Sequence, residues 1–518
     1  MSKSILKPFE DYQKARFTFV QTIADLATRP QNIIALHSAG VMSLLRPLLL
    51  DSVQVIQQSA ALAIGRLANY SEEIAESVIQ NDIITQLIYS LSNQNRFYKK
   101  AACYVLRAVA KHSDRLADDV VKSGALEPLI QNLSEFDVGV KESASWALGY
   151  IAKHSEILAQ QVVEAKAIFP LISCLQEPEI NLKRSCTQTL SNICQHSEFL
   201  ANKVVEAGIE HISALINVND VQLKRNVCLL LGNIAKHSAD LADKVWFSIS
   251  DQRYLIACLL DSDVTIKKSA AFCICEIVNK GKDKADNVVK LGGLAILANL
   301  ISTIKGEARL FAIIALGFIA SHDEKFAEAI INCDCIPHLK DALENESESN
   351  LKAAACYTLG KMGMFAPKHA EKITEYGVLK TMLFYLNHEK SSQDLKVKAK
   401  KALYNIIDNC GKLEHLEPLI ATAPVKVLKK ILDRFELNMK NDKENDKTFK
   451  KKFVSEGGLK TLLAIQKKYN DTESFRDKDR EDLKKITDIV NMFEPEIIKV
   501  LSPDYHVIME EEINRYNG

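Results

Sequence analysis

The sequence is short of the features that mark several common classes of protein. Aromatic residues make up only 7% of the 518 residues, and lysine plus arginine balance aspartate plus glutamate at 66 each. This balance excludes the strong basic field that many nucleic-acid-binding proteins carry. No apolar run reaches the roughly 18 residues that a membrane helix needs, and the first residues lack a signal peptide's apolar core. We therefore expect a cytosolic or nuclear protein with no nucleic-acid or membrane partner.

Motifs of catalysis are also missing. The chain has no glycine-rich phosphate loop, no Gly-x-Ser-x-Gly elbow and no metalloprotease signature. Its 12 cysteines lie mostly within apolar helical stretches, which is typical of free thiols in a reducing compartment. Cys273 with Cys275, and Cys333 with Cys335, have Cys-x-Cys spacing, but a zinc site needs four ligands and no second pair lies near either. We expect no enzyme activity, no cofactor and no metal.

What the sequence does contain is an internal repeat, seen most clearly between Lys141 and Leu182. An apolar stripe from Ala144 to Ile151 has helical spacing, and Ser155 stands at the N-cap of a second, short helix. A third apolar stripe begins at Phe169 and ends before Pro178. One repeat therefore consists of three helices.

The same pattern recurs about every 42 residues along most of the chain, which is the armadillo range. A cation opens the longest helix of the unit in eight of its copies, and Gln57 takes this place in the first. The eight cations are Lys99, Lys141, Lys183, Lys224, Lys267, Arg309, Lys352 and Lys396. A small or polar residue separates the two short helices at Gly40, Asp82, Gly124, Lys166, Gly208, Gly292, Asp334 and Gly377.

The cation column has two explanations. A cation at the start of a helix is mildly unfavourable against the helix dipole, so its recurrence needs a cause. The lysines could be solvated or paired with nearby acids such as Glu142 and Glu179. Alternatively, they form a stripe that binds an acidic partner, because a line of like charges focuses the electric field. Both explanations stay open at the level of sequence, and the eight cations are the candidate partner-binding residues.

Four histidines also recur one repeat apart. They are His112, His154, His196 and His237. Stacked helices lie about 8 to 10 Å apart, so these side chains cannot easily share a catalytic centre. An imidazole near the end of a helix can bond the last carbonyl groups, which is the role we expect.

The repeats divide the chain into three parts. Residues 1–29 are expected to form an amphipathic helical cap, which a solenoid needs at its first repeat. Residues 30–436 hold the repeats, with the break before residue 250 degraded to Trp246 and Phe247. Residues 437–518 contain a last repeat, interrupted by the charged run from Lys440 to Lys452, and a C-terminal helical cap.

The helix triplets and the phrases Ala-Leu-Gly-Tyr-Ile-Ala and Leu-Gly-Asn-Ile-Ala resemble the armadillo family. The resemblance implies an all-α, right-handed superhelical solenoid of three-helix repeats, in which the longest helices line a groove that binds other proteins. The nuclear import branch of the family uses repeated Trp and Asn on that helix. Here those positions hold Trp only at Trp146, and Asn only at Asn192, Asn233 and Asn405, so an import receptor is disfavoured.

A closer resemblance is carried by longer phrases that the fold does not require. They are LATRPQNI from Leu26, GVMSLLRPLLLD from Gly40, QNRFYKKAA from Gln94, FDVGVKESASWALGYIAKH from Phe136 and QEPEI from Gln176. These resemble the armadillo proteins of the ciliary central apparatus.

This resemblance implies a structural scaffold of the axoneme that binds and stabilises one central-pair microtubule and is needed for motility. The implied partners are tubulin, other central-apparatus proteins and further copies of the chain along the microtubule, and the implied location is the cytoskeleton of the cilium or flagellum. The alternative function is a soluble armadillo adaptor that binds an extended peptide of a cargo or signalling partner.

Overall fold

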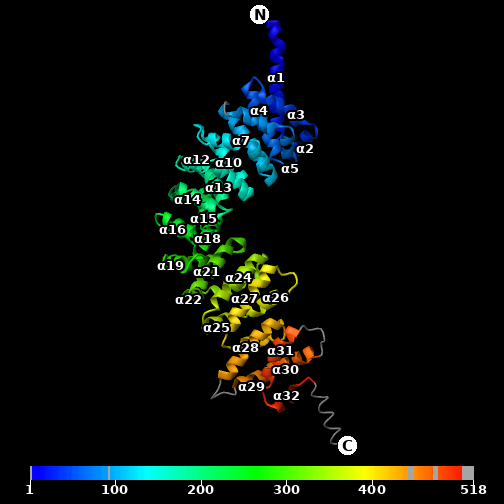
Figure 1. The fold of residues 1–518 in the computed structure, drawn as a ribbon, viewed down its shortest axis with the longest axis vertical. Helices are drawn as coiled ribbons and strands as arrows, with labels where there is room; N and C mark the ends of the chain where they lie inside the picture. Colours follow the sequence, from blue (N-terminus) through cyan, green and yellow to red (C-terminus); the bar gives the residue numbers. More distant parts are fainter. Residues whose placement is uncertain (1–2, 92–93, 442–447, 471–476, 504–518) are drawn as a thin grey trace. The chain divides into compact units, whose positions relative to one another are not determined.

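A computed structural model of the chain describes all residues except 1–2, 92–93, 442–447, 471–476 and 504–518. Every regular element in the described residues is a helix (Figure 1). The chain packs as two units, Met1–Lys280 (unit 1) and Gly281–Gly518 (unit 2). The sequence-based division into cap, repeats and final segment stays a prediction.

Unit 1 alternates long helices with pairs of short ones. Its helices are α1 (Lys3–Leu26), α2 (Pro30–Ser38), α3 (Val41–Leu45), η1 (Arg46–Leu50), α4 (Gln54–Ala68), α5 (Glu72–Gln80), α6 (Ile83–Leu91), α7 (Arg96–Ala110), α8 (Asp114–Lys122), α9 (Leu126–Asn132), α10 (Val138–His154), α11 (Glu156–Glu164), α12 (Ile168–Cys174), α13 (Ile180–Cys194), α14 (Glu198–Ser213), η2 (Ala214–Asn217), α15 (Val221–Ala235), α16 (Ala239–Ser248), α17 (Arg253–Cys258) and α18 (Val264–Val278). The long helices after α1 are α4, α7, α10, α13, α15 and α18, and each packs on its predecessor.

Unit 2 continues the pattern. Its helices are α19 (Lys282–Lys290), α20 (Gly293–Thr303), η3 (Gly306–Arg309), α21 (Leu310–His322), α22 (Glu324–Asn332), α23 (Cys335–Asn345), α24 (Ser349–Met362), α25 (Pro367–Glu375), α26 (Val378–Asn387), α27 (Gln393–Asn409), η4 (Leu413–His415), η5 (Glu417–Leu419), α28 (Val425–Asn441), α29 (Thr448–Ser455), α30 (Gly458–Asn470), α31 (Asp477–Val490) and α32 (Pro495–Leu501). The long helices α21, α24, α27, α28 and α31 pack in that order.

The long helix of the reference repeat begins three residues before Lys141. Asp137 is its N-cap, and the carboxylate accepts a hydrogen bond from the Val140 N–H at 3.1 Å. Ser155 is the N-cap of α11, as expected, but its hydroxyl accepts no capping hydrogen bond. The inward stripe of α10, including Ala147, Leu148 and Ile151, is fully buried. Each buried leucine or isoleucine contributes about 1.5 to 3 kcal/mol.

The breaks between short helices share one backbone feature. Each of the eight break residues predicted from the repeat has a positive φ. A left-handed residue at this place turns the chain sharply after one helix and lets the next begin at once. Asp82, Lys166 and Asp334 adopt this conformation without being glycine, at φ of 51°, 70° and 55°. The conformation is therefore imposed by the repeat and not by the local residue type.

The degraded sixth break uses a different device. After α16 the chain leaves in an extended conformation at Ile249, with no left-handed residue. The Gln252 side-chain amide instead donates hydrogen bonds to the carbonyl oxygens of Trp246, at 3.1 Å, and Ile249, at 3.3 Å. A side chain thus satisfies carbonyl groups that would otherwise be left at the helix end.

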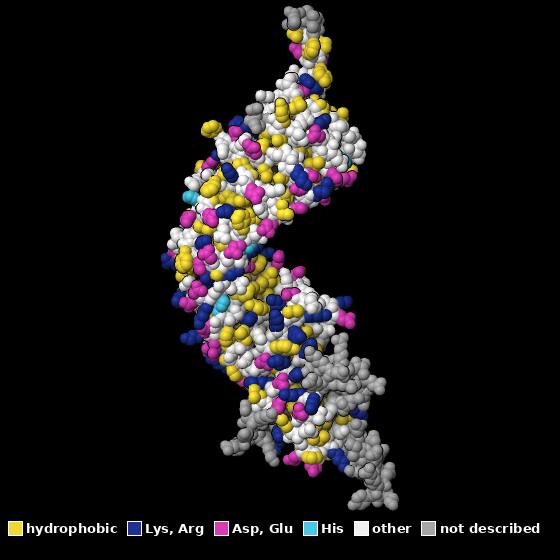
Figure 2. Space-filling view, in the orientation of Figure 1, with side chains coloured by type: hydrophobic (Ala, Val, Ile, Leu, Met, Phe, Trp, Pro, Cys, Tyr) yellow, Lys and Arg dark blue, Asp and Glu magenta, His cyan; other side chains and the backbone are white. Residues whose placement is uncertain are grey.

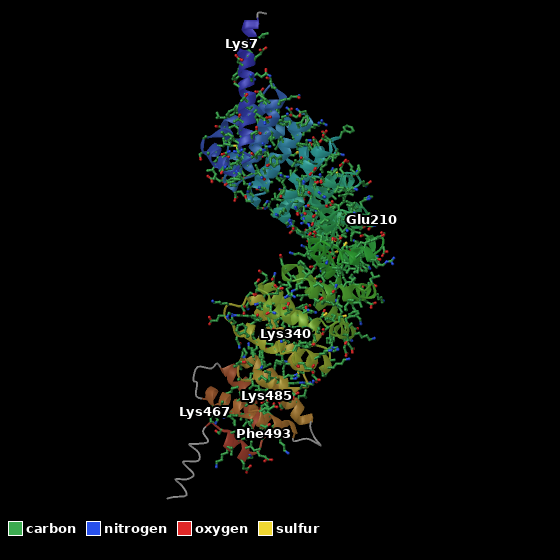
Figure 3. The ribbon with its side chains drawn as sticks, turned by 180° about the vertical axis from the view of Figure 1, so that it is seen from behind. Lys7, Glu210, Lys340, Lys467, Lys485 and Phe493 are labelled. Atoms are coloured by element: carbon green, nitrogen blue, oxygen red, sulfur yellow. The ribbon has the colours of Figure 1, made fainter. Side chains whose placement is uncertain are left out.

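The far end of unit 2 has its own small core. Phe435, Phe453 and Phe493 lie in a row, with ring centroids 5.2 and 6.0 Å apart. Lys485 on α31 pairs with Asp433 at 2.8 Å and Glu436 at 2.7 Å on α28, which raises the pKa of its ammonium (Figure 3). Of the expected charged run, residues 442–447 lie outside the described residues.

Candidate partner-binding surface

The expected cation column lies at or just before the first turn of the long helices. In unit 1 the column has one lysine in the first turn of each of the long helices α7, α10, α13, α15 and α18. In unit 2 it consists of Arg309, at the end of η3, and one lysine each on α24 and α27. The eight side chains do not share one environment. They divide into a group that is ion-paired within the protein and a group that is not.

Three lysines of unit 1 pair with the acid that ends their own repeat. Lys99 bonds Glu135 at 2.6 Å, Lys224 bonds Asp261 at 3.0 Å, and Lys141 bonds Glu177. Each acid stands 36 or 37 residues further along the chain, in the loop before the next long helix. The local pairing foreseen for this column therefore exists, but its acids are those of the loop.

Arg309 is the most deeply buried member of the column, with 1% of its surface exposed. Its guanidinium bonds Asp341 at 3.1 Å and Glu346 at 2.6 Å. Glu346 also accepts a hydrogen bond from the Gly306 N–H at 2.8 Å. This network ties η3 to α23 and the loop after it.

Lys183 and Lys267 are half-exposed and have no carboxylate partner among the residues that the structure describes. Beside Lys183, Arg184 takes the loop acid of that repeat, with Nε 2.9 Å from Asp220 Oδ1. This bond lowers the pKa of the Asp220 carboxyl. Because the neighbouring arginine occupies the acid, the charge of Lys183 remains available to a partner.

The last two members of the column are held weakly. Lys352 lies over the ring of Tyr385, with Nζ 4.8 Å from the centroid, and Lys396 donates to the carbonyl oxygen of Glu389 at 3.3 Å. Both are half-exposed, and no carboxylate within the described part of unit 2 forms an ion pair with either. We call Lys183, Lys267, Lys352 and Lys396 the open cations.

A second feature of unit 2 is a set of lysines supported by aromatic rings. Lys398 and Lys361 lie 4.9 and 5.7 Å from the ring centroid of Tyr357, and Lys400 lies 5.5 Å from that of Tyr404. Figure 2 shows Lys and Arg, in dark blue, gathered over the part of unit 2 where α24 and α27 lie. The sequence pattern did not single out these lysines, because Lys398 on α27 reaches Tyr357 on α24 from the next repeat.

Unit 1 has a smaller set of the same kind. Arg107 lies over Tyr104 with 5.0 Å to the centroid, and Lys153 lies over Tyr150 at 6.0 Å. Trp146 packs beside Tyr150 with centroids 6.3 Å apart. An aromatic ring under a cation holds it in place without neutralising its charge. Both units therefore present fixed positive charge on their long helices.

The asparagines of the long helices are used inside the protein. The amide nitrogen of Asn192 donates to Gly149 O at 2.9 Å, that of Asn233 to Ser191 Oγ at 3.0 Å, and that of Asn405 to Gly360 O at 3.2 Å. Each bond joins a long helix to the long helix before it. These donors hold neighbouring repeats together, and a peptide ligand would have to compete for them.

The four recurring histidines lie at helix ends, as expected, and each serves the helix of the preceding repeat. Their Nε2 atoms lie 2.7 or 2.8 Å from carbonyl oxygens of Ala68, Ala110, Ala152 and Cys194. Beside two of them, Lys111 bonds Asn69 O at 2.6 Å and Lys236 bonds Gln195 O at 2.7 Å. We call this set the histidine clamps.

Two of the clamps, those of His112 and His237, make the stability of unit 1 depend on pH. Burial lowers the pKa of His112 and of His237, because a charged ring loses hydration there. With a folded-state pKa below the unfolded value of about 6.5, each ring is neutral in the folded protein, so its contribution is complete above that pH and falls below it.

We expect the double variant His112→Gln and His237→Gln to lose less stability on acidification than the natural chain. Glutamine can donate to the same carbonyl groups without titrating. Thermal unfolding followed by circular dichroism at pH of about 7.5 and about 5.5 measures the difference. His388→Gln, at an exposed position, is the control and should behave as the natural chain does. An equal fall in all three proteins would contradict the role assigned to the clamps.

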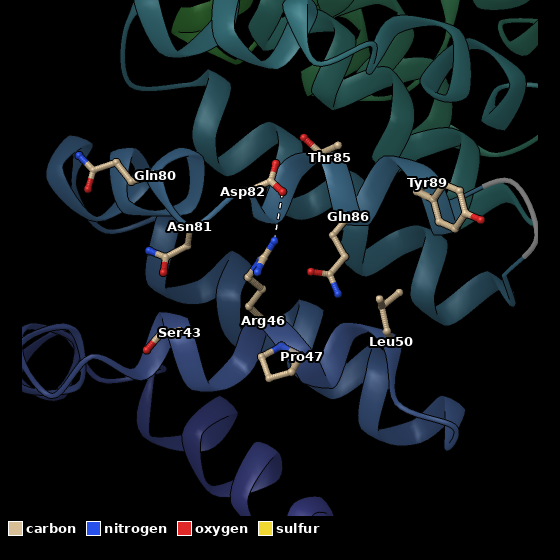
Figure 4. A pocket seen from close by; sticks show the side chains of 10 residues that line it. All are labelled: Ser43, Arg46, Pro47, Leu50, Gln80, Asn81, Asp82, Thr85, Gln86 and Tyr89. Atoms are coloured by element: carbon tan, nitrogen blue, oxygen red, sulfur yellow. Dashed lines mark hydrogen bonds and ion pairs between the residues drawn. The ribbon is translucent and has the colours of Figure 1, made fainter.

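The short helices of unit 1 form an open hollow of about 890 Å³ (Figure 4). Arg46 and Asp82 face each other across it with 3.1 Å between Nη2 and Oδ2. The amides of Gln80 and Gln86 and the ring of Tyr89 also line the hollow.

The described residues contain no group of three or more His, Cys, Asp or Glu side chains placed to hold a metal ion. Eleven of the cysteines are buried and Cys333 is exposed. Within the same residues no single helix has the length and apolarity to cross a membrane. Three pairs of consecutive helices, each bent at the break between its members, have that length and apolarity as pairs.

Three helices per repeat, a left-handed break between the short pair and long helices stacked on one another define an all-α armadillo-repeat solenoid. Residues 113–153 match the family model of the Armadillo/beta-catenin-like repeat. The chain is similar to sperm-associated antigen 6 of mouse, with 67% identity over 100 residues, and to the human protein of that name, with 66%. These matches span 19% of this chain and 20% of each relative.

A solved structure supports the fold alone. The crystal structure of an engineered protein superposes with a TM-score of 0.68 at 21% identity, covering 77% of this chain and 98% of that chain. The fold class expected from the sequence is confirmed.

Proposed function

We propose that this chain is a non-enzymatic scaffold of the axoneme central apparatus in cilia and flagella. In this role it binds and stabilises one central-pair microtubule, C1, together with projection proteins, and is needed for motility. The similarity to sperm-associated antigen 6 and the armadillo repeats support the proposal. The observation that carries it is the set of open cations, which recur along the long helices with no acid of their own.

The physical argument rests on many weak contacts. One exposed cation contributes only about 0 to 1 kcal/mol to an ion pair, but several cations on the long helices of each unit bind a repeated acidic surface together. Tubulin in a microtubule is the acidic filament that we propose as partner. The attachment is then sensitive to salt, because at physiological ionic strength dissolved ions screen the attraction between exposed charges that are more than about 8 to 10 Å apart.

The test is charge reversal at the open cations. We expect the variant with Lys183, Lys267, Lys352 and Lys396 all changed to Glu to bind microtubules at least about tenfold more weakly in co-sedimentation, from a few tenths of a kcal/mol per contact. Lys141 and Lys224 are left unchanged, because reversing them would also break internal ion pairs.

A matched control carries the same kind of change on the short helices. Lys203 and Lys244 are exposed and pair only with near neighbours, Glu206 at 2.9 Å and Asp240 at 2.7 Å. Lys203→Glu with Lys244→Glu should leave binding nearly unchanged. Equal binding by both variants would mean that the open cations are merely hydrated and make no contact with the microtubule. Absence of microtubule binding, with one dominant peptide recovered by pull-down, would favour the adaptor function.

A further inference from the structure

The first short helices of the repeats share a charged position that two of them lack. From α5 to α25, the second residue of this helix is exposed in every copy. Six of the eight copies carry a charged residue there, namely Glu73, Arg115, Asp240, Asp283, Lys325 and Lys368. The other two copies, α11 and α14, are neighbours in the stack and carry Ile157 and Phe199. We call these two residues the apolar pair.

Where a cation occupies this position, it can join one repeat to the preceding one. Arg115 of α8 bonds Glu76 of α5 at 3.2 Å, and Lys368 of α25 bonds Glu328 of α22 at 2.9 Å. Both acids are the fifth residue of their helix, and in α11 that residue is Gln160, which is exposed. The apolar pair therefore replaces a charge that joins neighbouring repeats elsewhere in the chain.

The apolar pair does not belong to the core. The residues that follow it, Leu158 and Leu200, are buried, whereas Ile157 is 72% exposed and Phe199 57%. Lys203, one turn after Phe199, lies over its ring with Nζ 5.7 Å from the centroid. Large apolar side chains that the fold leaves exposed on two adjacent repeats are typical of the anchor residues of a protein interface.

The surface around the apolar pair is acidic. Helix α11 and residues 198–206, which open α14, hold four glutamates and one lysine. The adjacent short helices α8 and α16 hold five acids and three cations. Figure 2 shows Asp and Glu side chains, in magenta, on the side of unit 1 where α14 and α16 lie. In a chain whose formal charge is zero, this edge is locally negative, so it attracts a positively charged partner.

The spacing of the apolar pair favours a helical partner. Stacked helices lie about 8 to 10 Å apart, so equivalent residues of α11 and α14 are separated by about that distance. Residues seven positions apart on an α-helix share one face and lie about 10.5 Å apart along its axis. Side chains on one face of an extended strand repeat about every 6.6 Å, so their separations of about 6.6 and 13 Å do not match.

We propose that the edge formed by α11 and α14 docks an amphipathic helix of another protein. Two apolar side chains of that helix, seven residues apart, contact Ile157 and Phe199, and lysines or arginines beside them face the glutamates of α11 and α14. The inference rests on the proposed scaffold function and deepens it, because it gives the chain a docking surface for a second protein. This surface lies on the short helices, whereas the open cations belong to the long ones.

The experiment uses the purified full chain and a fluorescent synthetic peptide of about 18 residues, or five helical turns, with leucines on one face and lysines beside them. Fluorescence anisotropy measures its binding. A peptide of the same composition in scrambled order, and one with glutamate in place of lysine, should not bind. The double variant Ile157→Ser with Phe199→Ser should bind the first peptide at least about tenfold more weakly than the natural chain, because both anchors are lost while the charge is unchanged.

Leu260→Ser with Val264→Ser is the matched control, since these apolar residues of unit 1 are 60% and 45% exposed away from α11 and α14. It should bind the peptide as the natural chain does, and circular dichroism checks that both double variants keep their helix content. Microtubule co-sedimentation of all three proteins should be equal, which separates this proposal from the role of the open cations. Failure of the natural chain to bind the helical peptide, or equal peptide binding by all three proteins, overturns the proposal. So does self-association of the natural chain that the Ile157 and Phe199 variant loses, because the occupant would then be a second copy.

Discussion

Replacing Arg309 by methionine is expected to lower the free energy of unfolding of unit 2 by about 3 kcal/mol or more. The guanidinium is buried and bonds both Asp341 and Glu346. Methionine fills much of the space but leaves Glu346 without its cation, while Asp341 keeps only the more distant cation of Lys305, at 3.8 Å. Glu346 would then keep only its hydrogen bond from the Gly306 N–H among these contacts. Removal of one partner from a buried ion pair is costly because the remaining charge is desolvated.

The chain provides its own reporter for this measurement. Both tryptophans, Trp146 and Trp246, lie in unit 1, so tryptophan fluorescence follows unit 1, while far-ultraviolet circular dichroism follows all helices. In urea unfolding, Arg309→Met should move the dichroism transition and leave the fluorescence transition in place. The exposed pair of Lys368 and Glu328 provides the control, since Lys368→Met should cost less than about 1 kcal/mol. Equal shifts for the two variants would mean that Arg309 is no more important than a surface cation.

Gly360→Ala is expected to destabilise unit 2 by about 1 to 3 kcal/mol. Helix propensity alone gives the opposite sign, because alanine is favoured over glycine inside a helix by about 1 kcal/mol. A Cβ at this position of α24 would lie 2.6 Å from Ala402 Cα and 2.8 Å from Ala402 Cβ on α27. Since Cα is part of the backbone, no side-chain rotation relieves the overlap, and the two helices must move apart.

A second glycine separates the steric effect from propensity. At Gly139 on α10 a Cβ would come within 3.0 Å of Lys100 Cδ, which belongs to a flexible side chain. Gly139→Ala should therefore leave the fluorescence transition of unit 1 unchanged or raise it slightly, as helix propensity favours. Gly360→Ala should lower the dichroism transition of unit 2. A neutral or stabilising effect of Gly360→Ala would show that the helix contact adapts at little cost.

Much of the fold follows from the period of the sequence. Apolar spacing located the helices of the reference repeat, although α10 begins three residues earlier than the pattern indicated, because Asp137 caps it. The recurring break predicted a turn at Asp82 and Lys166, where residue type alone gives little indication of a positive φ. A column of equivalent positions carries information that one position lacks.

The sequence located the eight cations of the candidate site, but it could not tell which of them are ion-paired within the protein and which are open. The acids that pair with Lys99 and Lys141 are 36 residues away in the chain and become their neighbours only when the helices of the repeat pack together. Lys183 stays open because Arg184, and not Lys183, bonds the Asp220 carboxylate. Which of the two neighbours forms this bond depends on side-chain geometry. The eight cations therefore remain a proposal as a group, and the open cations are the part on which a binding test is most direct.

The histidine clamps have a consequence for how the protein is made. Each ring bonds a carbonyl group 43 or 44 residues earlier, at the end of the preceding long helix. During synthesis on the ribosome, that helix end waits without this bond until the next repeat has emerged. While the repeats from α4 to α15 are being made, the nascent chain thus carries one helix end without its histidine bond, and this end moves along the chain as each new histidine emerges.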